Sequence, residues 1–215
     1  MRPPTECRWS FPPASQWHPN DDIVAVGADL ETDTLLYAYA HAMFPMFIDK
    51  KHKQLGWWSP PMRGIFPLDG FHASRSVRKS ARKFHCTINT AFSDVMHSCA
   101  TEHTDGNWID EHFIEAYTEL HAQGHAHSIE VWNSDNELVG GVYGVRINNF
   151  FAGESMFHRE TDASKVALMF LIDVMNLDGM KLFDTQWLTD HLETLGAIEI
   201  PRETYRELLN EAIAE

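Results

Sequence analysis

The sequence predicts an α+β fold in which a small N-terminal domain precedes a domain with a central, mostly antiparallel sheet. Three observations support this prediction. Helices alternate with short segments as far as residue 123, three strand-like runs follow from His127, and helical apolar spacing returns at Ala163. The 215 residues, 44% of them hydrophobic, suffice for one substantial core with a smaller appended lobe. We expect domains of residues 1–61 and 62–215.

The N-terminal part predicts one helix and a long loop. The helix begins near Thr32 or Asp33, either of which can act as its N-cap, and it stops before Pro45. Residues 47–61 contain lysines, paired tryptophans and two adjacent prolines. This composition indicates a loop between the two domains.

Short elements follow in the middle of the chain. We expect a helix over residues 74–84, a strand over residues 86–88 and a helix over residues 90–100. Asp110 is a favourable N-cap for a further helix, which Gly124 ends.

The sequence from residue 127 onward predicts the main sheet. Three antiparallel strands joined by turns are followed by a helix, a strand, a loop, another strand and a final helix. The expected strands cover residues 127–132, 137–147, 150–157, 181–186 and 197–201, and the expected helices cover residues 163–177 and 202–215.

The net charge of −14 argues against a nucleic acid partner until its distribution is considered. Residues 1–100 hold 11 Lys and Arg against 9 Asp and Glu, whereas residues 101–215 hold 6 against 22. Only the first half can therefore face a polyanion.

Several other classes of protein and site are disfavoured. No apolar run is long enough to span a bilayer, and the first residues lack the apolar core of a signal peptide. The three cysteines show no paired spacing, so we expect reduced thiols in a cytoplasmic protein. No H-E-x-x-H motif, C-x-x-C motif or phosphate-binding glycine loop occurs, so we expect neither a metal nor a cofactor.

A stripe of cations lies in the segment RSVRKSARK. On a helix the cations fall within about 140° of arc, while Val77, Ala81 and Phe84 fall on the opposite side. A solvated helix surface is the ordinary interpretation. A row of cations without acids is nevertheless costly in an acidic protein unless an anion such as an RNA backbone binds it. The cationic stripe consists of Arg75, Arg78, Lys79, Arg82 and Lys83.

Glu154 lies inside the apolar strand FFAGESMF, where an unpaired carboxylate loses its hydration. A cation should therefore meet it. Either Arg146 or Arg159 pairs with Glu154 as part of the fold, or the cation belongs to a ligand.

Asp184 and Gln186 share one face of the strand KLFDTQ, opposite Phe183 and Thr185. An acid and an amide at the end of an apolar strand form either a buried hydrogen-bond network or a reaction centre. The spacing leaves both interpretations open.

Seven strings in the chain are together highly specific: GADL at 27–30, WWSPPMRG at 57–64, SRS at 74–76, GHAHSIEVW at 124–132, ELVGGVYGV at 137–145, GESMF at 153–157 and LGAIEIPR at 195–202. From about residue 21 to its C-terminus the chain resembles the leucyl/phenylalanyl-tRNA–protein transferases. The resemblance implies that the second domain has the acyltransferase-like fold of the acetyltransferase (GNAT) superfamily.

The resemblance also implies a function. An enzyme of this family moves Leu, Phe or Met from aminoacyl-tRNA to proteins that begin with Arg or Lys. The products then enter N-degron (N-end rule) degradation. The expected partners are thus a charged tRNA and an acceptor protein, without a membrane or a metal.

Individual roles follow from the same resemblance. The catalytic pair is Asp184 and Gln186, with Asp184 hydrogen-bonded to Gln186, whose amide oxygen accepts from the attacking amine. Glu154 holds the acceptor N-terminus, and the cationic stripe contacts the tRNA acceptor stem. The pocket for the amino acid and the 3′ adenosine is formed by Tyr39, Met46, Trp108, Tyr117, Val142, Phe151 and Leu168.

Two departures from the family pattern and two rival functions remain. Met46 replaces a tryptophan, which leaves the preference between Leu and Phe open, and Thr189 replaces an asparagine.

An acyl-CoA-dependent acetyltransferase would need a Q/R-x-x-G-x-G/A turn, where this chain reads HRETDASK. A non-catalytic adaptor for basic N-termini would leave the cationic stripe, Asp184 and Gln186 unexplained.

Overall fold

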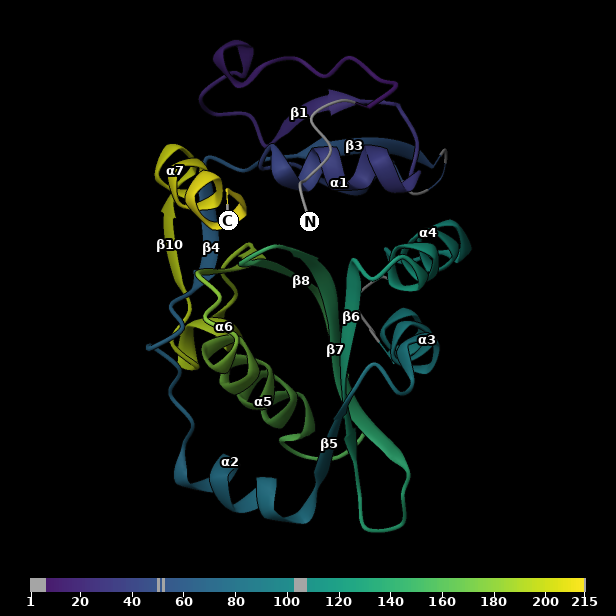
Figure 1. Cartoon of the computed structure of the whole chain (residues 1–215), viewed down its shortest axis with the longest axis vertical. Coiled ribbons are helices and arrows are strands. Elements are labelled where there is room, and N and C mark those ends of the chain that lie inside the picture. Colours follow the sequence, from purple (N-terminus) through teal and green to yellow (C-terminus); the bar gives the residue numbers. More distant parts are fainter. Residues whose placement is uncertain (1–6, 50, 52, 103–107, 215) are drawn as a thin grey trace.

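Two sheets of unequal size organise the chain, whose computed structural model describes residues 7–49, 51, 53–102 and 108–214 (Figure 1). The smaller sheet is antiparallel and lies beside helix α1 and a short 3₁₀ turn. Its strand order is β1-β3-β2, with β1 at Ile23–Val26, β2 at Phe44–Asp49 and β3 at Gln54–Trp58, while α1 covers Thr32–Ala40 and the turn covers Ala14–Gln16.

The larger sheet carries seven strands in the described part of the chain, in the order β10-β4-β9-β8-β7-β6-β5. All neighbouring strands are antiparallel except β8 and β9, which are parallel. This mixed topology confirms the α+β class and the mostly antiparallel sheet. The strands are β4 (Met62–Phe66), β5 (His85–Ile88), β6 (Ala126–Trp132), β7 (Leu138–Ile147), β8 (Phe150–His158), β9 (Leu182–Gln186) and β10 (Ile198–Pro201).

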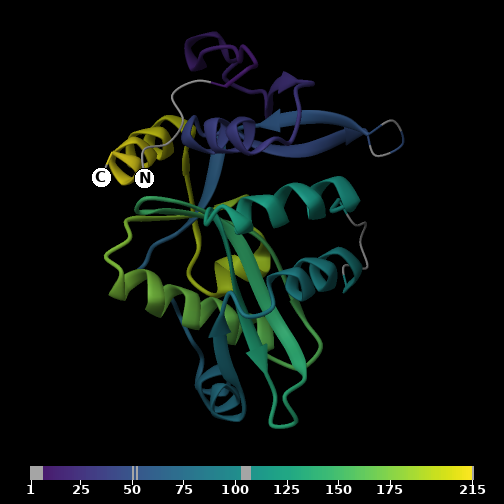
Figure 2. The same ribbon diagram turned by 45° about the vertical axis from the view of Figure 1, so that its right-hand side comes forward.

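Helices cover both faces of the larger sheet. Helices α3 and α4 lie on one side and α5, the crossover between β8 and β9, lies on the other (Figures 1 and 2). Two clusters of buried apolar side chains fill the space on the two sides. The remaining helices are α2 (Arg75–Ser80), α3 (Phe92–Glu102), α4 (Glu111–Ala122), α5 (Ala163–Leu177), α6 (Asp190–Thr194) and α7 (Arg202–Ile213), with a 3₁₀ turn at Ala81–Lys83. None of the helices in the described residues is long and apolar enough to cross a membrane.

The expected loop at 47–61 is wrong, because most of it forms the hairpin of β2 and β3. Pro45 lies in β2, an edge strand of the smaller sheet, where a missing N–H does not interrupt the central pairing. Trp57 in β3 is fully buried, and its Nε1 donates to the Gly27 carbonyl at 2.9 Å. The paired tryptophans therefore mark a core strand.

Other boundaries differ by smaller amounts. Helix α1 follows Glu31 as its N-cap and ends at Ala40, because Ala42 adopts a positive φ of 65°. The helix expected over 74–84 is α2 followed by the 3₁₀ turn, and the sequence reasoning missed the short elements β1, β4 and α6.

Candidate active site

A β-bulge sets the direction of Glu154. Tyr143 in β7 is paired with Ser155 in β8, and the next pair is Gly144 with Gly153, so Glu154 is an extra residue in β8. The alternation of side chains shifts there: Ala152 and Phe157, five positions apart, join the same buried cluster. Bulges re-aim side chains in this way. The bulge directs Glu154 toward its hydrogen-bond partners, Tyr117 of α4 and Gln186 of β9.

Hydroxyls and an amide surround the Glu154 carboxylate. The Tyr117 hydroxyl donates to Oε2 at 3.3 Å, and Gln186 Nε2 donates to Oε1 at 3.3 Å. The hydroxyls of Tyr39 and Tyr117 are also hydrogen-bonded to each other. These contacts join α1, α4, β8 and β9 at a single carboxylate.

Neither arginine suggested as a structural partner reaches Glu154. Arg146 pairs with Asp178 at 2.8 Å, and Arg159 pairs with Glu102 at 3.0 Å. Among the described residues no ion pair to Glu154 is found, so the structural-pair interpretation is wrong. Burial raises the pKa of Glu154 from its ordinary 4.5 to about 8, and the negative charge of Asp184 contributes, although hydrogen bonds from tyrosine hydroxyls oppose the shift.

Asp184 is held by an arginine that the sequence reasoning missed. Arg63 in β4 donates from Nε to Oδ1 at 2.8 Å and from Nη2 to Oδ2 at 2.7 Å, and the Tyr205 hydroxyl donates to Oδ2 at 3.0 Å. The side chains of Arg63 and Asp184 are only 1% and 0% exposed. A lone arginine in the apolar run of β4 was the available signal, because a buried guanidinium requires an acid.

Gln186 occupies a strained backbone position. Its φ is +59°, and the Trp187 N–H donates to the Thr185 carbonyl at 2.7 Å across it, which closes a three-residue turn. The turn lies against Gly64 of β4, where a Cβ would come within 2.6 Å of the Trp187 backbone. Only glycine at position 64 leaves room for this approach.

The contact between the two expected catalytic residues differs from the expectation. Asp184 Oδ1 accepts from the backbone N–H of Gln186 at 3.0 Å, whereas the Gln186 side-chain amide donates to Glu154. Asp184 therefore fixes the backbone of the turn, and the side chain of Gln186 remains directed at the Glu154 site.

The family model described as leucyl/phenylalanyl-tRNA protein transferase matches residues 65–210, and the model of that family's N-terminal domain matches residues 28–61. The chain belongs to the leucyl/phenylalanyl-tRNA protein transferase family.

Relatives named leucyl/phenylalanyl-tRNA–protein transferase extend this match along most of the chain. The relative from Pseudoalteromonas atlantica is 45% identical over 206 residues, which cover 94% of this chain and 87% of the relative. One from Cereibacter sphaeroides is 52% identical over 182 residues, covering 84% of each chain.

Two solved structures are more distantly similar. FemX has a TM-score of 0.48 at 12% identity, covering 82% of this chain and 70% of its own. An acetyltransferase of the GNAT family from Staphylococcus aureus has a TM-score of 0.37 at 16% identity, covering 46% of this chain and 71% of its own.

The pocket residues that the transferase family implies fall into two groups. Tyr39, Tyr117 and Trp108 pack in or against the cluster on the α3–α4 side, and Met46 lies in β2, where its carbonyl accepts from Trp58. The other group packs in the cluster on the α5 side and consists of Val142, Phe151 and Leu168. The structure thus brings Tyr39 and Tyr117 to Glu154 but places the second group on the other face of the sheet.

The cationic stripe lies on α2 and the 3₁₀ turn after it. Arg75, Arg78, Lys79, Arg82 and Lys83 are all exposed, while Val77 is buried. None of the ion pairs within the described residues includes a stripe cation. The part of the chain that the structure describes contains no group of three or more histidine, cysteine or acidic side chains placed to hold a metal ion.

Proposed function

We propose that the protein transfers Leu, Phe or Met from aminoacyl-tRNA to the N-terminal Arg or Lys of acceptor proteins in the cytoplasm. The modified proteins become substrates of N-degron degradation. Membership of the transferase family supports the aminoacyl transfer. The observation that carries the choice of acceptor is Glu154, a carboxylate with a raised pKa and, among the described residues, no cation paired with it.

The acceptor supplies the cation that Glu154 lacks. A guanidinium or ammonium group with several N–H donors can pair with the carboxylate and favour its ionised form. Glu154 then orients the acceptor's N-terminal residue beside Gln186, which is hydrogen-bonded to the same carboxylate.

The reaction is aminolysis of an ester. The α-amine nitrogen attacks the ester carbonyl carbon, the bond from that carbon to the 3′ ribose oxygen breaks, and a proton passes from the amine to the released oxygen. Because the ester is already activated, orientation supplies much of the acceleration, up to ~7–11 kcal/mol in favourable cases. Gln186 acts as an orienting hydrogen-bond partner of the amine, and Asp184 is a positioning residue that fixes the turn at Gln186.

The other assignments complete the proposal. The cationic stripe binds the tRNA acceptor stem. Of the expected pocket residues, Tyr39, Met46, Trp108 and Tyr117 contact the amino acid and the 3′ adenosine on the Glu154 side of the sheet. Val142, Phe151 and Leu168 contribute to the pocket from the other face of the sheet. The gap between the two family-model matches, after residue 61, supports a domain boundary between residues 61 and 62.

The test uses purified protein with radiolabelled Leu-, Phe- or Met-tRNA and matched peptides that begin with Arg, Lys, Ala or Glu. We expect label on the Arg and Lys peptides only. Binding of these peptides without transfer of label would indicate a non-catalytic adaptor. Degradation of an Arg-initiated reporter, with and without the enzyme, in a reconstituted adaptor–protease system tests the N-degron step.

A further inference from the structure

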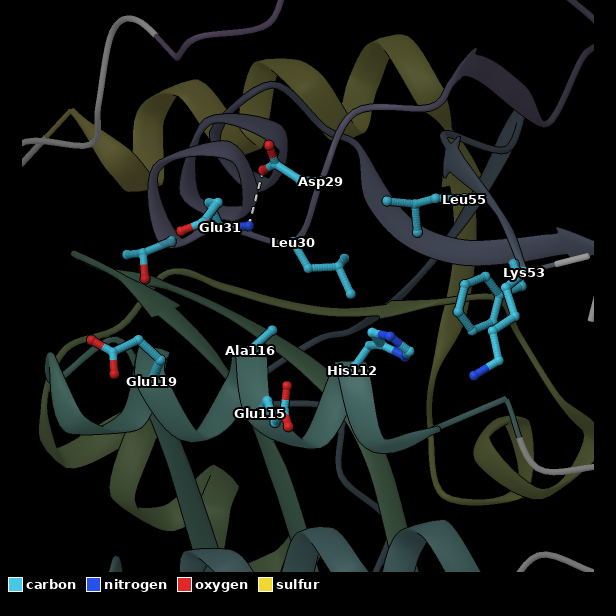
Figure 3. Close-up of a pocket in the computed structure, with 11 residues that line it drawn as sticks. Asp29, Leu30, Glu31, Lys53, Leu55, His112, Glu115, Ala116 and Glu119 are labelled. Atoms are coloured by element: carbon cyan, nitrogen blue, oxygen red, sulfur yellow. Dashed lines mark hydrogen bonds between the residues drawn. The ribbon is translucent and has the colours of Figure 1, made fainter.

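A cavity of about 490 Å³ opens between the start of α1, the β2–β3 hairpin and α4, outside the Glu154 site (Figure 3). Its walls include the apolar side chains of Leu30, Phe47, Leu55 and Ala116. Such surfaces favour contact with the aliphatic stems of long side chains.

Carboxylates dominate the charge of this cavity. Asp29 and Glu31 come from the segment before α1, and Glu115 and Glu119 come from α4 (Figure 3). Among the described residues that line the cavity, Lys53 is the single Lys or Arg, and it is paired with Asp110 at 2.8 Å. We call this cavity, with its apolar walls and four carboxylates, the acidic groove.

One cation of the chain itself already binds the edge of the acidic groove. The Arg8 guanidinium forms an ion pair with Asp29, with Nε 2.7 Å from Oδ2, and the Arg8 side chain is 63% exposed. Trp9 Nε1 donates to the same oxygen at 2.6 Å. A basic side chain from a segment without regular secondary structure is therefore accommodated at this edge.

The acidic groove is separated from Glu154 by a single helix. Residues 112, 115, 116 and 119 of α4 line the groove, with the i, i+3, i+4, i+7 spacing of one helix face. Tyr117, which contacts Glu154, lies on nearly the opposite face of α4. A chain bound at Glu154 can therefore reach the groove by passing across α4.

The cationic stripe lies far from this groove. Helix α2 is at one end of the molecule, and α1 with the smaller sheet is at the other (Figures 1 and 2). Phosphates are attracted to α2 and repelled by the carboxylates of the groove. The charge distribution thus assigns the two ends of the molecule to substrates of opposite charge.

We propose that the acidic groove binds cationic side chains of the acceptor polypeptide downstream of its N-terminal residue. This inference rests on the proposed function. A helix with its side chains is about 10–12 Å across, and an extended chain advances about 3.3–3.6 Å per residue. Lysine or arginine about three to four residues after the acceptor's N-terminal residue therefore matches the groove.

The experiment compares three peptides that all begin with Arg and have the same length. One carries Lys at positions 4 and 5, one carries Gln there, and one carries the two lysines at positions 11 and 12. We expect kcat/KM to be roughly three- to tenfold higher for the first peptide than for the other two at low salt, with the advantage lost at high salt. Equal kcat/KM for all three peptides overturns the proposal.

Charge-neutralising variants locate the effect. Glu115→Gln with Glu119→Gln should remove the advantage of the first peptide while keeping the preference for N-terminal Arg over Ala. The matched control is Glu203→Gln with Glu207→Gln on α7, which removes two exposed carboxylates elsewhere and should keep the advantage. An equal loss in both double variants would show a general field effect and overturn the assignment to the groove.

Equilibrium binding separates this inference from the proposed function. The Kd of the fluorescently labelled peptides is measured by anisotropy without tRNA. Tighter binding of the first peptide that depends on Glu115 and Glu119 supports the groove even if no amino acid is transferred. Absence of transfer to every peptide would instead contradict the proposed function.

Discussion

Arg63 and Asp184 form a two-point ion pair inside the protein, with N–O distances of 2.8 and 2.7 Å and almost no exposed surface. The partners lie 121 residues apart in the sequence. Because the carboxylate is occupied by Arg63, Tyr205 and the Gln186 backbone, we expect Asp184 to act on the reaction through the position of Gln186.

Replacing Asp184 by asparagine should therefore lower both stability and activity. The Asp184→Asn variant leaves the buried Arg63 charge uncompensated, so we expect a loss of about 3–5 kcal/mol in unfolding free energy. Urea denaturation measures this loss, and single-turnover transfer measures the fall in kcat. The double variant Arg63→Met, Asp184→Leu should recover stability without recovering transfer. If Asp184→Asn had the unfolding free energy of the wild type, the buried ion pair would not contribute to stability as proposed.

Two variants of Gln186 should separate an effect on stability from an effect on activity. Gln186→Ala and Gln186→Gly both remove the amide that contacts Glu154, and only Gly adopts the positive φ without strain. We expect Gly to be more stable than Ala by about 1 kcal/mol. Transfer should fall at least about tenfold in both, as one lost hydrogen bond to a charged group implies. Wild-type kcat in either variant would exclude a role for the amide.

The raised pKa of Glu154 predicts that the stability of the protein depends on pH. Its pKa in the folded state is raised to about 8, so the folded protein binds this proton more tightly than the unfolded chain does. The contribution of Glu154 to stability is then fully present below about pH 4.5 and is lost as pH rises through 8. Glu154→Gln cannot ionise, so its Tm should fall less than that of the wild type between pH 6 and 9. Parallel Tm curves would contradict the raised pKa.

The same residue should determine acceptor choice. Glu154→Gln preserves shape and removes the charge, so kcat/KM for Arg-initiated acceptors should fall by at least about tenfold while the Kd for charged tRNA changes little. For the wild type, KM for the acceptor should decrease as pH rises toward 8, because an ionised carboxylate binds the cation. The variant should lack that part of the pH profile.

The cationic stripe should control tRNA binding without affecting amino acid choice. Reversing Arg78, Lys79 and Arg82 to Glu should weaken binding of charged tRNA. It should also reduce the slope of log K against log salt by about 0.7–0.9 for each lost phosphate contact. Lys79→Glu alone is compared with Lys181→Glu, which reverses an exposed lysine on the loop before β9. Unchanged binding by the triple variant at low salt would show that the stripe is only solvated.

Local sequence predicted several elements closely. Helix α5 spans Ala163–Leu177 as the apolar spacing predicts, and Asp110 caps α4 by accepting from the N–H groups of His112 and Phe113. These features depend on residues within a few positions of one another, so a window of sequence contains the determining interactions. The hairpin of β2 and β3 was missed because the lysines at its turn and the prolines just after β3 indicate a loop, while Trp57 acquires its burial from packing with distant segments.

By itself the sequence determined that Glu154 and Asp184 lie on strands and that Glu154, in an apolar strand, needs a cation as its partner. The tertiary structure decided which atoms meet. The bulge at Glu154 depends on the register of β7 against β8, the turn at Gln186 depends on the space above Gly64, and Asp184 depends on Arg63 from a strand far away in the chain. A prediction from side-chain alternation assumes a regular strand. Strand register and long-range pairing arise only when separate segments of the chain pack together.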